Sequence, residues 1–215
     1  MNYKEYKDIN KVKQAKKILN SVHTELRKYT RKNKVRFGLE LMGSGKNGVI
    51  LTPKNVENQG NILFDLDFQI MITRWTTEDE WKEKFRIVKN KLVKLFEEEG
   101  FTLSNGHTRC YKFYPKNKND STFCFSFETV FTLYHKKTRK KFEVIRKDDG
   151  SLIREEEKQT VKPITYKKLK LINRDNLRPD LVENYIKKRE SDDERPHYQS
   201  FVMSVNEVCD YEPAE

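Results

Sequence analysis

The segment GNILFDLDFQIMI, residues 60–72, constrains the fold of this 215-residue chain more than any other. Its apolar residues are typical of a buried β-strand, but Asp65 and Asp67 interrupt them two positions apart. Because strand side chains alternate between two faces, both carboxylates lie on the same face, with Cα atoms roughly 6.6 Å apart. At an effective dielectric of about 20, two such charges repel by roughly 3 kcal/mol. Because the predicted strand, residues 61–73, contains this repulsive pair, we infer that the two aspartates have a functional role.

The charge of the chain is strongly positive and unevenly distributed. The net charge is +11 and the pI is near 9.4, which favours an anionic partner such as nucleic acid or a phosphorylated substrate. Residues 1–40 hold twelve Lys or Arg against four acids, a net of 12 − 4 = +8. The lysines of this segment form either a solvated surface or a surface that contacts phosphates.

Several classes of protein are excluded by the cysteines and by hydropathy. Cys110, Cys124 and Cys209 form no CxxC pair, which argues against a disulfide scaffold or a zinc knuckle and favours a reducing compartment. No run approaches the roughly 20 apolar residues that a membrane span needs, and the N-terminus is charged throughout. We therefore expect a cytoplasmic protein.

The hydrophobic periodicity predicts a helix over residues 5–31 and a second helix that starts at Thr77, with Glu80 as its capping-box partner, and stops at Gly100. Strand patterns occupy VRFGLEL, residues 61–73, RCYKFYP, STFCFSFETVFTLYH and KKFEVIRKD. Two further helices are expected, from Pro179 to Arg189 and over residues 197–209. This order predicts an α+β fold, with a mixed β-sheet flanked by helices.

Three pieces of sequence suggest one chemistry. Gly43 and Ser44 leave the first strand, Asp65 and Asp67 lie on the next, and Glu128 sits between apolar residues in FSFETVF. Carboxylates on neighbouring strands are the ligands that two Mg²⁺ ions share in phosphoryl transfer, and the ions would remove the repulsion of the aspartates. A Gly-Ser turn lets backbone N–H groups and a hydroxyl approach phosphates closely.

In this order, the motifs MGS, DLDF and FET resemble those of the DNA polymerase β-type nucleotidyltransferase superfamily, which includes the cGAS-like synthases. The resemblance implies a nucleotidyltransferase core over residues 1–150 and a mostly helical C-terminal extension, residues 151–215, packed on it. It also implies that Asp65, Asp67 and Glu128 are catalytic and bind two Mg²⁺ or Mn²⁺ ions, with Asp67 bridging them. Gly43 and Ser44 would hold the triphosphate of an NTP, and Lys46 is a further candidate phosphate contact.

The sequence departs from the family pattern in two places. Asp65 follows Ser44 by 65 − 44 = 21 positions, so GKNGVILTPKNVENQG is an insertion or an extra hairpin. The third acid is Glu where the family more often has Asp, and Glu143 in KFEVIR is a rival to Glu128 for that role. GSGK is not a P-loop, because Glu40 stands where the first glycine is needed and Asn47 where Ser or Thr binds Mg²⁺.

Two functions follow as hypotheses. The first is a metal-dependent, ATP- or NTP-binding nucleotidyltransferase that moves NMP onto a hydroxyl of an RNA end, a nucleotide or another acceptor and releases pyrophosphate. The second is a catalytically inactive protein of the same fold that serves as an RNA- or partner-binding module, for example in a toxin–antitoxin or defence system. The sequence leaves the oligomeric state open.

Overall fold

The computed structural model describes residues 3–46, 48–53, 62–104, 108–117, 122–156, 166–192 and 197–210. The chain divides into two compact units. The sheet unit comprises Asp8–Leu41 and Asn58–Glu157. The helical unit comprises Met1–Lys7, Met42–Glu57 and Lys158–Glu215, so it combines three separate stretches of sequence.

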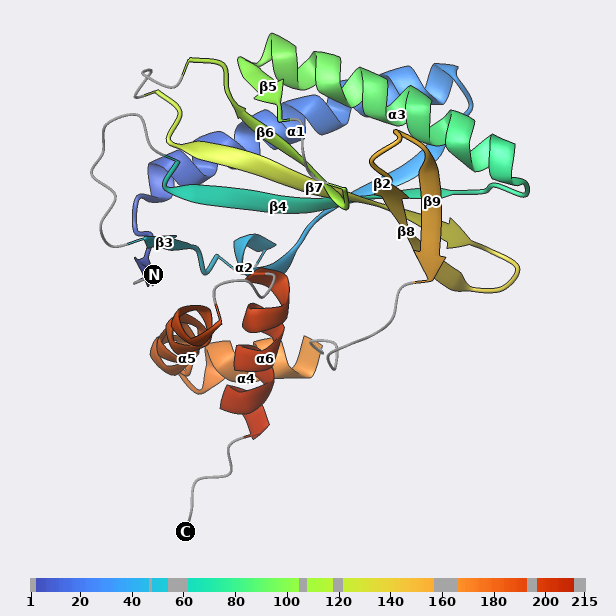
Figure 1. The fold of residues 1–215 in the computed structure, drawn as a ribbon. Coiled ribbons are helices and arrows are strands. Elements are labelled where there is room, and N and C mark those ends of the chain that lie inside the picture. The colour runs from blue at the N-terminus through green and yellow to red at the C-terminus, as the bar shows by residue number, and fades with distance from the viewer. Residues whose placement is uncertain are drawn as a thin grey trace. The chain divides into compact units, whose positions relative to one another are not determined.

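The sheet unit is built on a seven-stranded mixed sheet (Figure 1). Its main path runs in the order β2 (Arg36–Leu41), β4 (Phe64–Thr73), β7 (Phe125–His135), β6 (Cys110–Pro115), β5 (Phe101–Leu103). The C-terminal end of β7, past the residues that pair with β6, pairs with β8 (Lys140–Arg146), and β8 in turn pairs with β9 (Leu152–Glu156). The β4–β7 pair is parallel and the other pairs are antiparallel.

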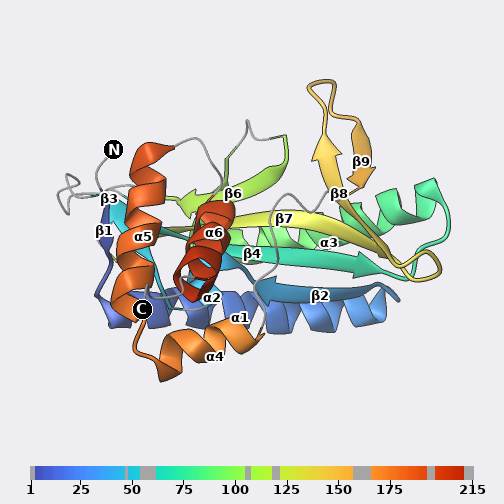
Figure 2. The same ribbon diagram turned by 90° about the horizontal axis from the view of Figure 1, so that it is seen from below.

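Two long helices, α1 (Ile9–Lys32) and α3 (Glu78–Glu98), cover one face of this sheet (Figures 1 and 2). Asp8 caps α1 by accepting hydrogen bonds from the N–H groups of Asn10 and Lys11. Thr77 caps α3 as predicted, but Glu80 accepts its hydrogen bond from the N–H of Thr76, one residue before the expected partner.

The alternation along β4 separates the core from the site. Phe64, Leu66, Phe68, Ile70 and Ile72 are buried, whereas the residues between them are partly exposed. The buried face packs with phenylalanines of α3 and the neighbouring strands; the rings of Phe96 and Phe113, for example, stack with centroids 4.2 Å apart. Since α1 and α3 cover the face with the buried residues, the partly exposed residues of β4 project from the opposite face of the sheet.

The helical unit has its own small core. A two-stranded sheet, β1 (Tyr3–Glu5) with β3 (Leu51–Pro53), belongs to it, together with α2 (Gly43–Lys46), α4 (Tyr166–Arg174), α5 (Arg178–Ser191) and α6 (His197–Asp210). Tyr3, Leu51, Leu181, Tyr185 and Phe201 are among the residues that are buried together there. Arg189 is buried as well, and its guanidinium donates a hydrogen bond to the hydroxyl of Tyr3.

The structure confirms the predicted α+β class, the mixed sheet and the helical C-terminal segment. It corrects the glycine turn, because Gly43–Lys46 forms one short helical turn in which the N–H of Lys46 donates to the carbonyl of Met42. Much of the long connection after Ser44, residues 54–61, lies outside the described residues. The division at residue 150 stays a prediction. Among the described residues, no helix is both long and apolar enough to cross a bilayer.

Candidate active site

The parallel pairing of β4 and β7 brings three acidic residues to the same region of the sheet. Asp65 is the register partner of Ser126, and Asp67 is the partner of Glu128. Facing residues of paired strands project to the same face of a sheet, so Asp65, Asp67 and Glu128 share the face opposite the two helices. We call these three residues the carboxylate cluster.

A lysine from the next strand contacts two members of the cluster. Lys112 on β6 is the register partner of Glu128. Its Nζ lies 2.8 Å from Oδ2 of Asp65 and 3.5 Å from Oε2 of Glu128. The Lys112 side chain is only 17% exposed, against 29% for Asp65 and 34% for Glu128. Among the described residues, Lys112 is thus the cation that contacts the cluster.

Hydrogen bonds fix Asp65 further. The buried hydroxyl of Ser126 donates to its Oδ1, while Lys112 holds Oδ2, so both carboxylate oxygens have a partner within the protein. The orientation of Asp65 is therefore set before any ligand arrives. Further along the same face, Gln69 donates a hydrogen bond to the hydroxyl of Thr132 across the β4–β7 pair at 2.6 Å.

The electrostatics of the cluster show that one lysine does not neutralise it. Burial raises the pKa of Asp67 well above its usual range; the charges of Glu128 and Asp65 raise it further, and Lys112 offsets only part of this. Burial, followed by the charge of Glu128 and a hydrogen bond to it, raises the pKa of the Cys110 thiol to about 12. Burial opposes the charge of Lys112, but Asp65 and Glu128 outweigh it and raise its pKa. The site therefore favours additional positive charge.

The donor set of the cluster fits a hard divalent cation, since all its ligands are carboxylate oxygens. Within the described residues, however, no three His, Cys, Asp or Glu side chains are gathered as closely as metal ligands are. The ammonium of Lys112 lies against two of the three carboxylates instead. A cation could bind all three only if Lys112 moved aside.

The other predicted site residues belong to other elements of the structure. Glu143, the rival third acid, is on β8 and forms an ion pair with Arg109 at 3.1 Å. Its register partner is Thr132, four residues along β7 from Glu128, or roughly 13 Å. Gly43, Ser44 and Lys46 form α2 in the helical unit, whereas the carboxylates belong to the sheet unit. Their role as phosphate contacts stays a prediction.

Sequence reasoning missed Lys112 and Ser126. Lys112 stands between two aromatic residues, Tyr111 and Phe113, that are both buried, so strand alternation alone places it on the polar face. What the sequence does not contain is the register between β6 and β7, which sets Lys112 beside Glu128. Tyr111 and Phe113 themselves belong to the core.

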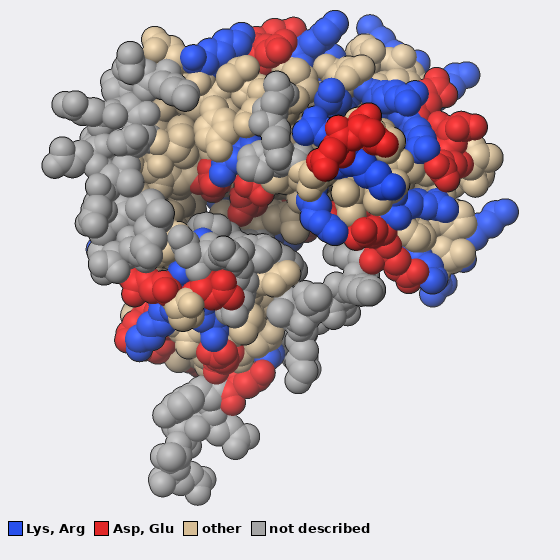
Figure 3. All heavy atoms as spheres, viewed as in Figure 1, with Lys and Arg blue, Asp and Glu red and all other residues tan. Residues whose placement is uncertain are grey.

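Outside the carboxylate cluster, several charged side chains on β8 and β9 form ion pairs. Arg109 contacts Glu155 as well as Glu143, and Lys140 pairs with Glu156. Figure 3 shows basic and acidic side chains interspersed over β8 and β9. The excess positive charge of the chain is therefore not concentrated on these strands.

Comparison with known proteins gives a match in structure only. No family model matches the sequence, and no curated protein matches it. Among solved structures, the chain is similar to a STING-associated CdnE c-di-GMP synthase from Capnocytophaga granulosa, with a TM-score of 0.51 and 10% identity. That match covers 92% of this chain and 59% of the synthase.

Two DncV structures also match, at lower TM-scores. The GTP-bound form from Vibrio cholerae gives a TM-score of 0.49 at 11% identity, covering 84% of this chain and 47% of DncV. The 3′-deoxy GTP-bound form from Escherichia coli gives 0.48 at 13% identity, covering 83% and 47%. The chain thus spans about half the length of the proteins it matches. The likeness to CdnE confirms the predicted nucleotidyltransferase-like fold.

Proposed function

We propose that this protein is a metal-dependent nucleotidyltransferase that transfers NMP from an NTP to a hydroxyl acceptor and releases pyrophosphate. One observation carries the proposal: the β4–β7 register sets Glu128 beside Asp67 and on the same face as Asp65. The fold shared with a c-di-GMP synthase supports it, because that protein is an enzyme whose product is made of nucleotides.

Each member of the cluster has a role that its environment supports. Bound divalent cations, two in our proposal, would neutralise the triphosphate and lower the pKa of the attacking hydroxyl. Asp65 and Asp67 would hold them, with the oxygens of Asp65 already oriented by Ser126 and Lys112. Glu128 would complete the site on the acceptor side. Gly43, Ser44 and Lys46 remain our candidates for contacts to the phosphates.

Lys112 would act as the counter-charge of the cluster before the cations bind. Its ammonium offsets part of the repulsion among three carboxylates that burial makes more severe. If cations took over the carboxylates, the ammonium of Lys112 would be available to contact a phosphate oxygen of the bound nucleotide.

The test is thermal melting of the protein with each of the four NTPs, with and without Mg²⁺. A ligand at about 100 times its Kd stabilises a protein by roughly 2.7 kcal/mol, which is several degrees for a chain of this size. We expect at least one NTP to raise the melting temperature only with Mg²⁺, and Asp65→Asn to remove the effect. Glu143→Gln, a carboxylate on the same sheet but outside the cluster, should behave like the wild type. If no NTP shifts the wild type, the proposal fails.

A second candidate is the non-catalytic binding module. The contacts of Lys112 with Asp65 and Glu128 favour it, because a permanent internal cation would leave the carboxylates as a structural ion-pair network. This candidate predicts RNA binding that weakens steeply with salt. It also predicts no Mg²⁺-linked effect of any NTP on melting.

A further inference from the structure

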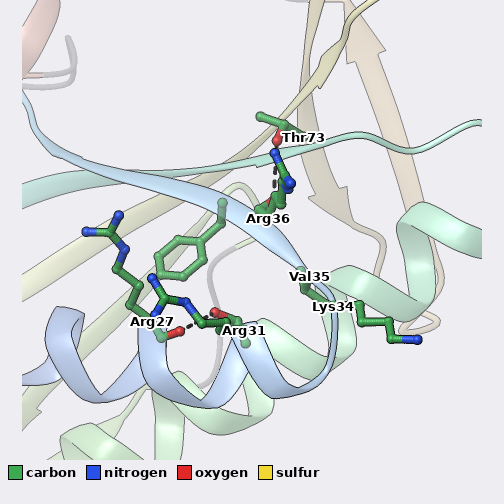
Figure 4. Close-up of a pocket in the computed structure, with 8 residues that line it drawn as sticks. Arg27, Arg31, Lys34, Val35, Arg36 and Thr73 are labelled. Carbon is green, nitrogen blue, oxygen red and sulfur yellow. Dashed lines mark hydrogen bonds between the residues drawn. The ribbon is translucent and has the colours of Figure 1, made fainter.

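A second charged region of the sheet unit lies where α1 ends and β2 begins (Figure 4). A cavity of about 640 Å³ is lined there by Arg27, Arg31, Lys34 and Arg36, and none of the described residues that line it is acidic. We call these four residues and their cavity the basic hollow. Thr73, at the end of β4, also lines it, eight residues and roughly 26 Å along the strand from Asp65.

Local structure explains how the cations come together. Arg27 and Arg31 are one helical turn apart, so they share a face of α1, and Figure 4 shows both extending toward β2. Lys34 has φ of 58°, a left-handed conformation that turns the chain back at once. This turn brings Arg36 to the first position of β2, opposite Thr73. Lys34 itself points away from the two helix arginines (Figure 4).

The end of α1 does not use these guanidinium groups for its own capping. The N–H of Lys34 donates to the carbonyl of Arg31, and the N–H of Val35 donates to that of Thr30 at 2.9 Å. The side-chain amide of Asn33 donates to the carbonyl of Tyr29. Since the carbonyls of Tyr29, Thr30 and Arg31 have these partners, the arginines are not needed to satisfy them.

The four cations of the basic hollow also make no ion pair with any side chain of the described residues. The nearest acid on the same turn of α1, Glu25, pairs with Lys28 at 2.6 Å. Burial lowers the pKa of His23, and the positive charge of Arg27 lowers it further. The charge of Arg27 therefore acts on His23, one helical turn before it.

We propose that the basic hollow binds a small anion that carries several phosphate groups, such as a nucleotide or an oligophosphate. Three of its four cations are arginines, whose planar guanidinium groups match phosphate oxygens in pairs. Its volume lies within the range of about 300–1,000 Å³ that is usual for small-molecule sites. Phe37 and the buried Val35 add an apolar wall against which a base or other ring can pack.

The shape of the region favours a small ligand over a nucleic acid strand. A strand is bound along a continuous basic track, whereas these arginines surround a single cavity. The same helix provides an internal comparison, because Lys13 and Lys17 are also exposed and one turn apart but do not line the hollow. They carry the same charge without the cavity.

Calorimetric titration of the purified chain with inorganic tripolyphosphate in EDTA tests this site without any metal. We compare the wild type, Arg27→Gln/Arg31→Gln and the control Lys13→Gln/Lys17→Gln. The control also loses two positive charges from α1, but at residues that do not line the hollow. All four residues are exposed, so the variants should fold, and circular dichroism checks this. We expect the arginine pair variant to raise the Kd about tenfold or more, and the lysine pair variant to change it less than about threefold.

Two further ligands decide the class of anion. Citrate carries three carboxylates and no phosphate, and we expect it to bind more weakly than tripolyphosphate. A single-stranded RNA decamer should not bind more tightly than tripolyphosphate. Three outcomes would overturn the proposal. The first is an equal loss of affinity for tripolyphosphate in both pair variants, and the second is tighter binding of citrate than of tripolyphosphate. The third is tighter binding of RNA than of tripolyphosphate, if Arg27→Gln/Arg31→Gln abolishes it. Asp65→Asn should leave tripolyphosphate binding unchanged, which separates this outcome from failure of the proposed catalytic site.

Discussion

The carboxylate cluster and the basic hollow lie near opposite ends of β4 and handle like charges in opposite ways. In the cluster, the ammonium of Lys112 contacts two of the three carboxylates, and the hydroxyl of Ser126 donates a hydrogen bond to that of Asp65. The basic hollow gathers four cations and gives them no carboxylate among the described residues. Both arrangements cost stability, because like charges repel at short range.

The difference between the two regions is one of burial. The cluster stands on a partly buried sheet face, where unpaired charge is expensive, and the fold provides Lys112. The cations of the hollow are exposed, so water screens them and no internal partner is required. The first region is therefore expected to respond strongly to substitution and the second weakly, unless a ligand is present.

The largest expected effect is on catalysis. Asp67→Asn removes a charge from the proposed cation site, so nucleotidyl transfer should fall by at least about 100-fold. Release of pyrophosphate from each NTP, alone and in mixtures, measures this. Glu143→Gln is the matched control, since that carboxylate pairs with Arg109 outside the cluster. Equal losses in the two variants would mean that the cluster has no special role.

Removal of the Lys112 ammonium should have the next largest effect. Lys112→Met leaves Asp65 and Glu128 without their ammonium, and the carboxylates are partly exposed, so we expect a loss of about 1–3 kcal/mol in EDTA. Mn²⁺ should then restore more stability to this variant than it adds to the wild type. Urea unfolding with and without Mn²⁺ gives both numbers. A variant as stable as the wild type in EDTA would contradict the role of Lys112.

The pH dependence of stability offers a finer test of the cluster. Because burial and its neighbours raise the pKa of Asp67, the folded protein keeps that proton to a higher pH than the unfolded chain does. The free energy of unfolding then falls as the pH rises from about 4 to the raised pKa. In EDTA at pH 7, Asp67→Asn should therefore melt about 2–4 °C above the wild type. Near pH 4 the difference should vanish; a constant difference would point to another cause.

The smallest effect concerns the turn that shapes the basic hollow. Lys34 has a left-handed conformation, which Asn tolerates better than Gln. Lys34→Asn and Lys34→Gln remove the same charge, so their difference isolates the backbone. We expect the Asn variant to be more stable by about 0.5 kcal/mol in urea unfolding. Equal stabilities would show that the turn carries no strain.

The sequence predicted most of the sheet unit because its signals are local. The alternation in residues 61–73 and the stripe of α1 each arise within one segment. Glu128 could be proposed from its apolar neighbours alone. Its place beside Asp67, and that of Lys112 beside Glu128, depend on strand register between segments far apart in the chain.

The basic hollow shows the same limit of prediction from sequence. The excess of lysine and arginine in residues 1–40 was evident, and it indicated either a solvated surface or a surface that contacts phosphates. Which of those cations surround a cavity depends on the left-handed turn at Lys34, where the sequence has no glycine to indicate it. Charge was therefore predictable, but its arrangement was not.

The most direct test of the central claim is a titration of the protein with Mn²⁺ followed by electron paramagnetic resonance. Free Mn²⁺ gives the signal, so its loss counts the bound ions; with an NTP, the Mn²⁺ bound by the same concentration of NTP without protein is measured separately and subtracted. We predict binding to the wild type in the presence of an NTP, two ions at saturation, and loss of binding in Asp65→Asn but not in Glu143→Gln. A wild type that binds no Mn²⁺ under these conditions would contradict the assignment of the carboxylate cluster as a cation site.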